Sequence, residues 1–295
     1  MNYRHAFHAG NFADVVKHAI LWRILSHLRK KDAPFRVIDT HAGTGVYDLQ
    51  SPEAVRNPEW RGGIGRILAD DLRSALPPDS DLLLSGYLDA VRAQNPGGRL
   101  RFYPGSPELV RAALRRDDRL IACEAEPGTA AALARRYRGD RQVKTIAIDG
   151  WTALRAYIPP RERRGLVLVD PPFEQPDELS RLGESLVAAA RKWPTGIFLA
   201  WYPVKNDAEV GAFMRTLWRS GIEKLLRVEL LAESGAGTVG LRGSGQIIVN
   251  PPWTLDEDLR AILPILSKRL NAHANDPPRI EWIGGARANS ALRDA

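Results

Sequence analysis

Residues 166–173 read LVLVDPPF, which is four apolar residues followed by an acid, two prolines and an aromatic ring. Leucine and valine in unbroken succession are typical of a strand that is covered on both faces. Proline ends such a strand, because it has no backbone N–H for the hydrogen-bond ladder. Residues 246–249, QIIV, follow the same apolar pattern. Both runs indicate a sheet with a layer of helices on each face.

Similar strand-like runs alternate with helix-like segments along most of the chain. This alternation predicts an α/β fold with a mostly parallel, seven-stranded sheet and helices on both faces. The expected strands are Phe35–Asp39, Leu120–Glu124, Val143–Ile148, Leu166–Asp170, Ile197–Tyr202, Leu225–Leu231 and Gln246–Asn250. The expected helices are Ala13–Lys30, Glu108–Arg115, Gly128–Arg138, Glu178–Lys192 and Ala208–Ser220.

One interval breaks the alternation. No strand-like run follows the turn at residues 40–47 until Leu120, and helix-like segments occur at Asp70–Ser74 and Asp81–Gln94. A structureless loop of this length would be unusual in a compact domain. We therefore predict a main domain of residues 1–48 and 100–283, an inserted helical sub-domain of residues 49–99, and a flexible tail of residues 284–295.

The composition is that of a globular protein, with 44% hydrophobic and 26% charged residues among 295. The single cysteine, Cys123, excludes an internal disulfide framework. No apolar run approaches the roughly 20 residues that span a bilayer, and the first residues lack the apolar core of a signal peptide. We expect a cytoplasmic protein with no membrane partner.

The chain is basic, since 42 Lys and Arg residues against 35 Asp and Glu residues give a formal net charge of +7. Arginine supplies most of this charge. It pairs with phosphate through two parallel hydrogen bonds, and released counterions favour such binding. Charge alone leaves two interpretations open: a partner such as a nucleic acid, or a basic protein without one.

Acidic residues close three of the expected strands. Asp39 precedes a turn with Gly43 and Gly45, where bare backbone would let a ligand approach the main chain. The turn lacks the Gly-Lys-Ser/Thr of a phosphate-binding loop and the third glycine of a dinucleotide fingerprint. Glu124 and Asp149 end the next two strands, where carboxylates can accept hydrogen bonds from ribose hydroxyls and an adenine amine. Taken singly, each could be an exposed carboxylate; together they favour a nucleotide-like ligand.

The motif Asp170-Pro171-Pro172-Phe173 is typical of enzymes that methylate exocyclic amines. An adenine amine is a poor nucleophile, because the ring delocalises its lone pair. A carboxylate and a proline carbonyl that accept its two N–H bonds favour the pyramidal geometry in which the lone pair can attack. An unstacked base can lie on Phe173, and Asp170 can accept the released proton or relay it to water. These four residues are our catalytic candidates.

Residues 250–253, NPPW, also fit this pattern and also follow an apolar strand. In a methyltransferase sheet the last strand runs antiparallel to its neighbours, so its end emerges away from the ligand edge. We therefore interpret Asn250 as a structural turn and Asp170 as the catalytic residue.

Several blocks of sequence resemble the bacterial large-subunit ribosomal RNA adenine-N6 methyltransferases of the RlmJ type. The longest spans residues 3–18, where YRHAFHAGN is followed by ADV and KH. The others are residues 39–43 (DTHAG), 103–107 (YPGSP), 170–172 (DPP), 201–203 (WYP) and 250–253 (NPPW). The matches run in order along nearly the whole chain, except in the insert and the C-terminal residues. The N-terminal block is specific to the family, whereas many amine methyltransferases share the DPP motif.

The resemblance implies a Rossmann-like class I S-adenosylmethionine-dependent methyltransferase with a helical insert. Its substrate would be the exocyclic N6 amine of an adenine in 23S ribosomal RNA, with the base extruded into the site at residues 170–173. Phe173 stands where the family often has Tyr, so the ring is kept without the hydroxyl. With Gly43 of the glycine turn, the implied cofactor-binding residues are His18, His41, Ser106, Glu124, Asp149, Gly150 and Asp170. Tyr3, His5 and Lys17 would face the RNA.

Two of these residues also have an interpretation from their neighbours alone. Ser106 precedes Pro107, which is typical of a serine N-cap followed by proline at the first helical position. Lys17 lies on a predicted amphipathic helix, where lysine ordinarily faces solvent. The five histidines before residue 42 have no cysteine partner and no HExxH spacing, so we expect no metal.

Three rival functions stay open from the sequence. A DNA adenine-N6 methyltransferase would use the same catalytic core. A protein-glutamine methyltransferase shares the Pro-Pro motif but fits the positive charge poorly. A non-catalytic RNA-binding assembly factor would not need the intact motif. We expect the protein to act as a monomer.

Overall fold

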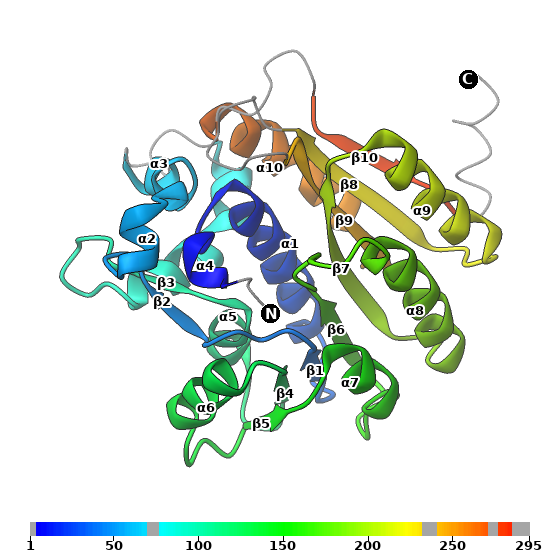
Figure 1. Ribbon diagram of the computed structural model, residues 1–295, viewed down its shortest axis with the longest axis horizontal. Coiled ribbons are helices and arrows are strands. Elements are labelled where there is room, and N and C mark those ends of the chain that lie inside the picture. Colours follow the sequence, from blue (N-terminus) through cyan, green and yellow to red (C-terminus); the bar gives the residue numbers. More distant parts are fainter. Residues whose placement is uncertain (1–3, 70–76, 232–240, 271–276, 285–295) are drawn as a thin grey trace.

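The computed structural model describes residues 4–69, 77–231, 241–270 and 277–284. A single large sheet runs through its centre (Figure 1). The strands are β1 Arg36–Asp39, β4 Arg119–Glu124, β5 Val143–Ala147, β6 Gly165–Val169, β7 Ile197–Val204, β8 Leu225–Leu231, β9 Gly243–Val249 and β10 Arg279–Trp282. They lie in the order β10-β8-β9-β7-β6-β1-β4-β5. The five strands from β5 to β7 in this order are parallel, β9 is antiparallel to β7 and β8, and β10 is antiparallel to β8.

The α/β prediction is confirmed, and all seven predicted strands are present with bounds that differ by a few residues at most. The structure adds an eighth, β10, at the edge of the sheet. This strand has only four residues, and none of them is buried. Its sequence therefore lacks the apolar run by which the interior strands are recognised.

Helices cover both faces of the sheet (Figure 1). On one face lie α1 (Phe12–Arg29), α5 (Ser106–Ala113), α6 (Pro127–Arg136) and α10 (Leu255–Arg269), and on the other lie α7 (Gly150–Ala156), α8 (Glu178–Lys192) and α9 (Asp207–Arg219). The side chains of β6 alternate between the two faces. Leu166 and Leu168 belong to the core under the first group of helices, and Val167 and Val169 belong to the core under the second group. Every residue of this strand is buried, as its unbroken apolar sequence predicts.

The segment predicted as an insert contains α2 (Pro52–Arg56), the short 3₁₀ helix η2 (Glu59–Arg61), α3 (Ile64–Ala69) and α4 (Pro78–Ala93). The expected helix at residues 81–94 corresponds to α4, whereas Asp70–Ser74 falls outside the described residues. A small antiparallel pair, β2 (Val46–Asp48) and β3 (Phe102–Pro104), joins the two ends of this segment. Apolar side chains of α4, such as Leu84 and Leu88, belong to the same core as α1. Helix α4 of this segment is therefore packed against the helices α1 and α10 that cover the sheet.

Strand direction separates the two Pro-Pro motifs. The carboxyl ends of β1, β4 and β6 lie at one edge and carry Asp39, Glu124 and Asp170. Because β9 is antiparallel to β7, Asn250 emerges at the opposite edge. Its side-chain amide donates to the carbonyls of Pro194 and Gly196, each at 2.8 Å. The interpretation of Asn250 as a turn residue agrees with this geometry.

No described helix combines the length and the apolar character needed to cross a membrane.

We expect the substitution Asn250→Ala to lower the free energy of unfolding by about 1–3 kcal/mol. The variant loses two hydrogen bonds to backbone carbonyls, and it places alanine at a φ of 51°, in the left-handed region. Urea unfolding followed by circular dichroism would measure the change. An unchanged unfolding midpoint would contradict this account of the turn.

Candidate active site

Two cavities meet at the edge of the sheet where the parallel strands end. The glycine-turn cavity has a volume of about 530 Å³ and is lined by His18, His41, Gly43, Ser106 and Glu124, among others. The aromatic cavity has a volume of about 470 Å³ and is lined by Phe173, Trp201 and Lys205, among others. Both volumes lie in the range of small-molecule sites. Four residues line both cavities: His5, Lys17, Asp170 and Pro172.

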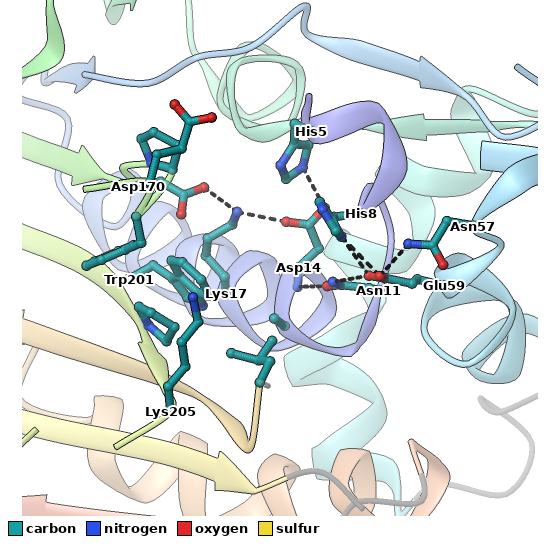
Figure 2. Close-up of a pocket in the computed structure, with 16 residues that line it drawn as sticks. His5, His8, Asn11, Asp14, Lys17, Asn57, Glu59, Asp170, Trp201 and Lys205 are labelled. Carbon is teal, nitrogen blue, oxygen red and sulfur yellow. Dashed lines mark hydrogen bonds and ion pairs between the residues drawn. The ribbon is translucent and has the colours of Figure 1, made fainter. Parts of the chain in front are cut away.

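Lys17 connects the two cavities through a buried chain of charges (Figure 2). Its ammonium group donates to Asp14 Oδ1 at 2.7 Å and to Asp170 Oδ2 at 2.5 Å. Burial by itself would lower the pKa of Lys17, but the two carboxylates together raise it above its ordinary value. Lysine therefore stays charged here and holds Asp170 in place. The alternative of a solvent-facing Lys17 is wrong, because only 5% of its side chain is exposed.

Asp14 extends this chain to the N-terminal segment. Its Oδ2 atom lies 3.0 Å from His5 Nε2 and accepts a hydrogen bond from Gly10 N at 2.9 Å. Burial would raise the pKa of Asp14, but the charges of His5 and Lys17 hold it well below its ordinary value. Asp14 is not among the residues that the sequence predicts for the site. Its position three residues before Lys17, on the same face of α1, is the signal that could have found it.

Glu124 is fixed by the backbone around the glycine turn. Its Oε2 accepts from Gly43 N at 2.9 Å, and its Oε1 accepts from Ala125 N and Glu126 N at 2.9 and 3.0 Å. The carboxylate is buried, so the alternative of an exposed strand-end acid is wrong. Each carboxylate oxygen has two lone pairs, so one accepting site, on Oε2, remains for a ligand in the cavity that Glu124 lines.

Burial keeps His18 neutral, and two buried tyrosines hold its ring in one orientation. Its Nδ1 lies 2.8 Å from Tyr103 Oη, which lies 3.0 Å from Tyr87 Oη. Burial lowers the pKa of His18 to about 3, so the ring is neutral. If Tyr87 donates to Tyr103 and Tyr103 donates to Nδ1, both hydroxyl protons are satisfied. The reverse direction would leave the buried Tyr87 proton without an acceptor among the described residues, which is costly. His18 therefore carries its proton on Nε2.

Ser106 differs from the sequence expectation. The helix α5 begins at Ser106 itself, with Gly105 as its N-cap, and the serine makes no capping bond. Ser106 Oγ instead donates to Asp39 Oδ2 at 2.6 Å. The hydroxyl of Ser106 is therefore used on Asp39, the fully buried acid at the end of β1, and not on a helix cap. Burial raises the pKa of Asp39 to about 7.

His41 and Asp149, the acid after β5, are neighbours with different surroundings. Burial lowers the pKa of His41 to about 4, and its ring packs edge-on against Trp151. Gly150 lies under this ring, since a Cβ there would lie 2.5 Å from His41 Nε2. Asp149 is exposed and caps α7 by accepting from Thr152 N at 2.8 Å. Of these predicted residues only His41 lines the glycine-turn cavity.

Phe173 and Trp201 form an aromatic wall. Their ring centroids lie 5.4 Å apart at an interplanar angle of 70°. Phe173 has a φ of 51°, which turns the chain sharply after the two prolines. Pro171 is buried, and Pro172 lines both cavities. The sequence analysis gave no role to Trp201, although the matching WYP block contains it. Tyr3 lies outside the described residues.

Among the described residues, no group of three His, Cys, Asp or Glu side chains is arranged to hold a metal ion.

The chain is similar to known proteins over nearly its whole length. A family model described as ribosomal RNA large subunit methyltransferase D, RlmJ, matches residues 32–284. The ribosomal RNA large subunit methyltransferase J of Escherichia coli K12 is 36% identical over 283 residues, covering 96% of this chain and 99% of that protein. The protein of the same name from Haemophilus influenzae is 36% identical over 284 residues, with the same coverage.

A solved structure also matches nearly the whole chain. The crystal structure of protein LPL1258 from Legionella pneumophila superposes with a TM-score of 0.83 at 33% sequence identity. The match covers 95% of this chain and 99% of that one. The two chains therefore share this fold over nearly their whole length.

The buried Asp39 predicts a pH-dependent stability. Because its pKa rises to about 7 in the folded state from about 3.9 in the unfolded state, the folded protein binds more protons between these values. The contribution of Asp39 to the free energy of unfolding therefore falls as the pH rises from about 4 to 7. We expect the substitution Asp39→Asn, which keeps an acceptor for Ser106, to gain about 1–4 kcal/mol relative to the parent protein across that interval. Urea unfolding at several pH values would measure it; parallel stability curves for the two proteins would contradict it.

Proposed function

Because the chain belongs to the RlmJ family of ribosomal RNA large subunit methyltransferases, we propose that its two joined cavities bind S-adenosylmethionine and an extruded adenosine. The chain is an rRNA methyltransferase, and we assign its target as the N6 amine of an adenine in 23S ribosomal RNA. The observation that carries this assignment is the position of Asp170, which lines both cavities at their junction.

The glycine-turn cavity fits the cofactor. The neutral His18 presents an Nε2–H donor, which suits a carboxylate or hydroxyl oxygen. Glu124 keeps an accepting site on Oε2 for one hydroxyl of a ribose. His41 and the start of α5 at Ser106 complete the lining, and Asp149 and Gly150 lie beside His41. When bound, the cofactor supplies an electrophilic methyl group on a sulfonium.

The aromatic cavity fits a purine. Phe173 and Trp201 offer ring faces on which an unstacked base can lie. Asp170 Oδ2 is held by Lys17, while Oδ1 has no hydrogen-bond partner among the described residues. Oδ1 is therefore the atom that accepts an N–H of the target amine. A proline carbonyl of the motif accepts the other N–H, and the amine lone pair is directed at the methyl group.

Asp170 also receives the proton that the amine releases, or passes it to water. Lys17 does not take this proton, because it already carries its full complement and its raised pKa keeps it charged. It serves to position the carboxylate. His5 and Lys17 line both cavities, which fits the expected contact with RNA. Family membership favours ribosomal RNA over DNA, and the intact motif favours an enzyme over an assembly factor.

We expect the substitution Asp170→Asn to lower kcat for methylation of a 23S ribosomal RNA fragment by at least about 100-fold. Asparagine keeps a hydrogen-bond acceptor near Lys17 but loses the carboxylate that receives the proton. Cofactor affinity, measured by calorimetry, should change by no more than a few fold. Asn250→Ala, in the second Pro-Pro motif, is the matched control and should retain full activity. Full activity in Asp170→Asn would refute the mechanism.

The substitution Glu124→Gln tests the cofactor assignment. Replacing an ionised acceptor by a neutral one should weaken S-adenosylmethionine binding about tenfold, because hydrogen bonds to charged groups are the stronger class. Isothermal titration calorimetry would measure the dissociation constant, and RNA binding should be unaffected. An unchanged cofactor affinity would mean that Glu124 serves only to hold the glycine turn.

A further inference from the structure

The aromatic cavity has a second wall, opposite Phe173 and Trp201. It is built from the N-terminal segment and the insert (Figure 2), and it includes His8, Asn11, Asn57 and Glu59. These residues are unnecessary for holding the target amine at Asp170, which lies on the other side of the cavity in Figure 2. Their chemistry indicates a different task.

Glu59 organises this wall. Only 1% of its side chain is exposed, and a buried carboxylate is costly unless donors surround it. It accepts from Asn11 Nδ2 at 2.9 Å, from Asn57 Nδ2 at 2.8 Å, and bonds His8 Nδ1 at 3.0 Å. The Nδ2 atom of Asn57 is used on Glu59, whereas its Oδ1 atom accepts no hydrogen bond from the described residues. Asn57 lines the cavity, and Oδ1 is its available acceptor.

The wall is held firmly against the catalytic elements. Ile64 N donates to the carbonyl of Gly10 at 2.8 Å. A Cβ at Gly63 would lie 2.0 Å from the same carbonyl oxygen, so the backbone of the insert touches the N-terminal segment directly. Asn11 is the N-cap of α1, the helix that carries Lys17. The position of Asn57 relative to Asp170 is therefore set by packed backbone.

Two exposed arginines are sequence neighbours of residues in this wall. Arg56 directly precedes Asn57, and Arg61 lies two residues after Glu59. Neither forms an ion pair with any residue in the described ranges, and Arg61 lies over the Trp60 ring at 5.6 Å. Arginine without an acidic partner beside a nucleotide cavity is suited to phosphate, which it binds through two parallel hydrogen bonds.

We propose that this insert wall binds the RNA strand next to the target adenosine. Arg56 and Arg61 contact its phosphates, and the side-chain Oδ1 atom of Asn57 accepts an N–H from the edge of a neighbouring base. The proposal rests on the RNA methyltransferase function above and adds a specificity site to it. The rival explanation is a structural clip, in which Glu59 only ties the insert to the N-terminal segment.

The arginine contacts are tested with the double variant Arg56→Gln/Arg61→Gln in the full-length protein. The matched control is Arg191→Gln/Arg219→Gln, which removes the same charge from exposed positions at the ends of α8 and α9. These helices follow β6 and β7, so they end at the sheet edge opposite the active site. The measurements are KM and kcat for a 23S ribosomal RNA hairpin at several salt concentrations, with cofactor affinity by calorimetry.

For Arg56→Gln/Arg61→Gln we expect KM for RNA to rise about tenfold with kcat and cofactor affinity unchanged. The slope of log KM against log salt should fall by about 1.4, the amount for two single-strand phosphate contacts. The control should behave like the parent protein. Equal effects in both double variants, or no effect in either, would overturn the proposal. If the parent protein methylates no RNA, the proposed function itself fails.

The base contact is tested with Asn57→Ala on a panel of hairpins that differ only in the nucleotides beside the target. We expect the parent protein to discriminate among them by about tenfold in kcat/KM, and the variant to lose that discrimination. A parent protein without any preference would overturn the base contact. A variant whose kcat/KM falls equally on every hairpin would identify Asn57 as part of a structural clip.

Discussion

The buried ammonium of Lys17 is the interaction on which the site depends. Burying this charge is tolerable only because Asp14 and Asp170 lie on either side of it. One partner is on its own helix and the other is 153 residues away in the sequence, so the pair forms only when α1 is packed against the carboxyl end of β6. Breaking such a buried pair by removing one partner typically costs about 3–5 kcal/mol. The same contact therefore holds the N-terminal helix in place and fixes the Asp170 carboxylate at the junction of the two cavities.

The remaining polar groups of the site are also positioned by buried partners. Gly43 N holds Glu124, the tyrosine pair holds His18, and Ser106 holds Asp39. A hydrogen bond that satisfies a buried group also removes its rotational freedom, so these side chains meet a ligand already oriented. Burial of such groups lowers the free energy of unfolding at a pH where they ionise, as the raised pKa of the buried Asp39 carboxyl group indicates.

The helical segment at residues 49–99 contributes to both cavities. Tyr87, on α4, sets the proton position of His18 in the glycine-turn cavity. Glu59 and Asn57 form a wall of the aromatic cavity. Because this segment shares its core with α1, a displacement of the segment would disturb both cavities together.

The alternation of strands and helices and the acids at strand ends were sufficient to predict the α/β sheet and to bring Asp39, Glu124 and Asp170 to one edge, because the ends of parallel strands meet there. The expected antiparallel direction of the last strand likewise predicted that Asn250 and Asp170 lie at opposite edges of the sheet. Only the tertiary structure decided the surroundings of each side chain. Lys17 is buried because α1 is enclosed by the sheet, α4 and α10. The sequence pattern of α1 instead predicts that lysine lies on a solvent-facing side of the helix. Ser106, Glu59 and the tyrosine pair have partners that are distant in sequence, and hydrogen bonds of that kind leave no local pattern.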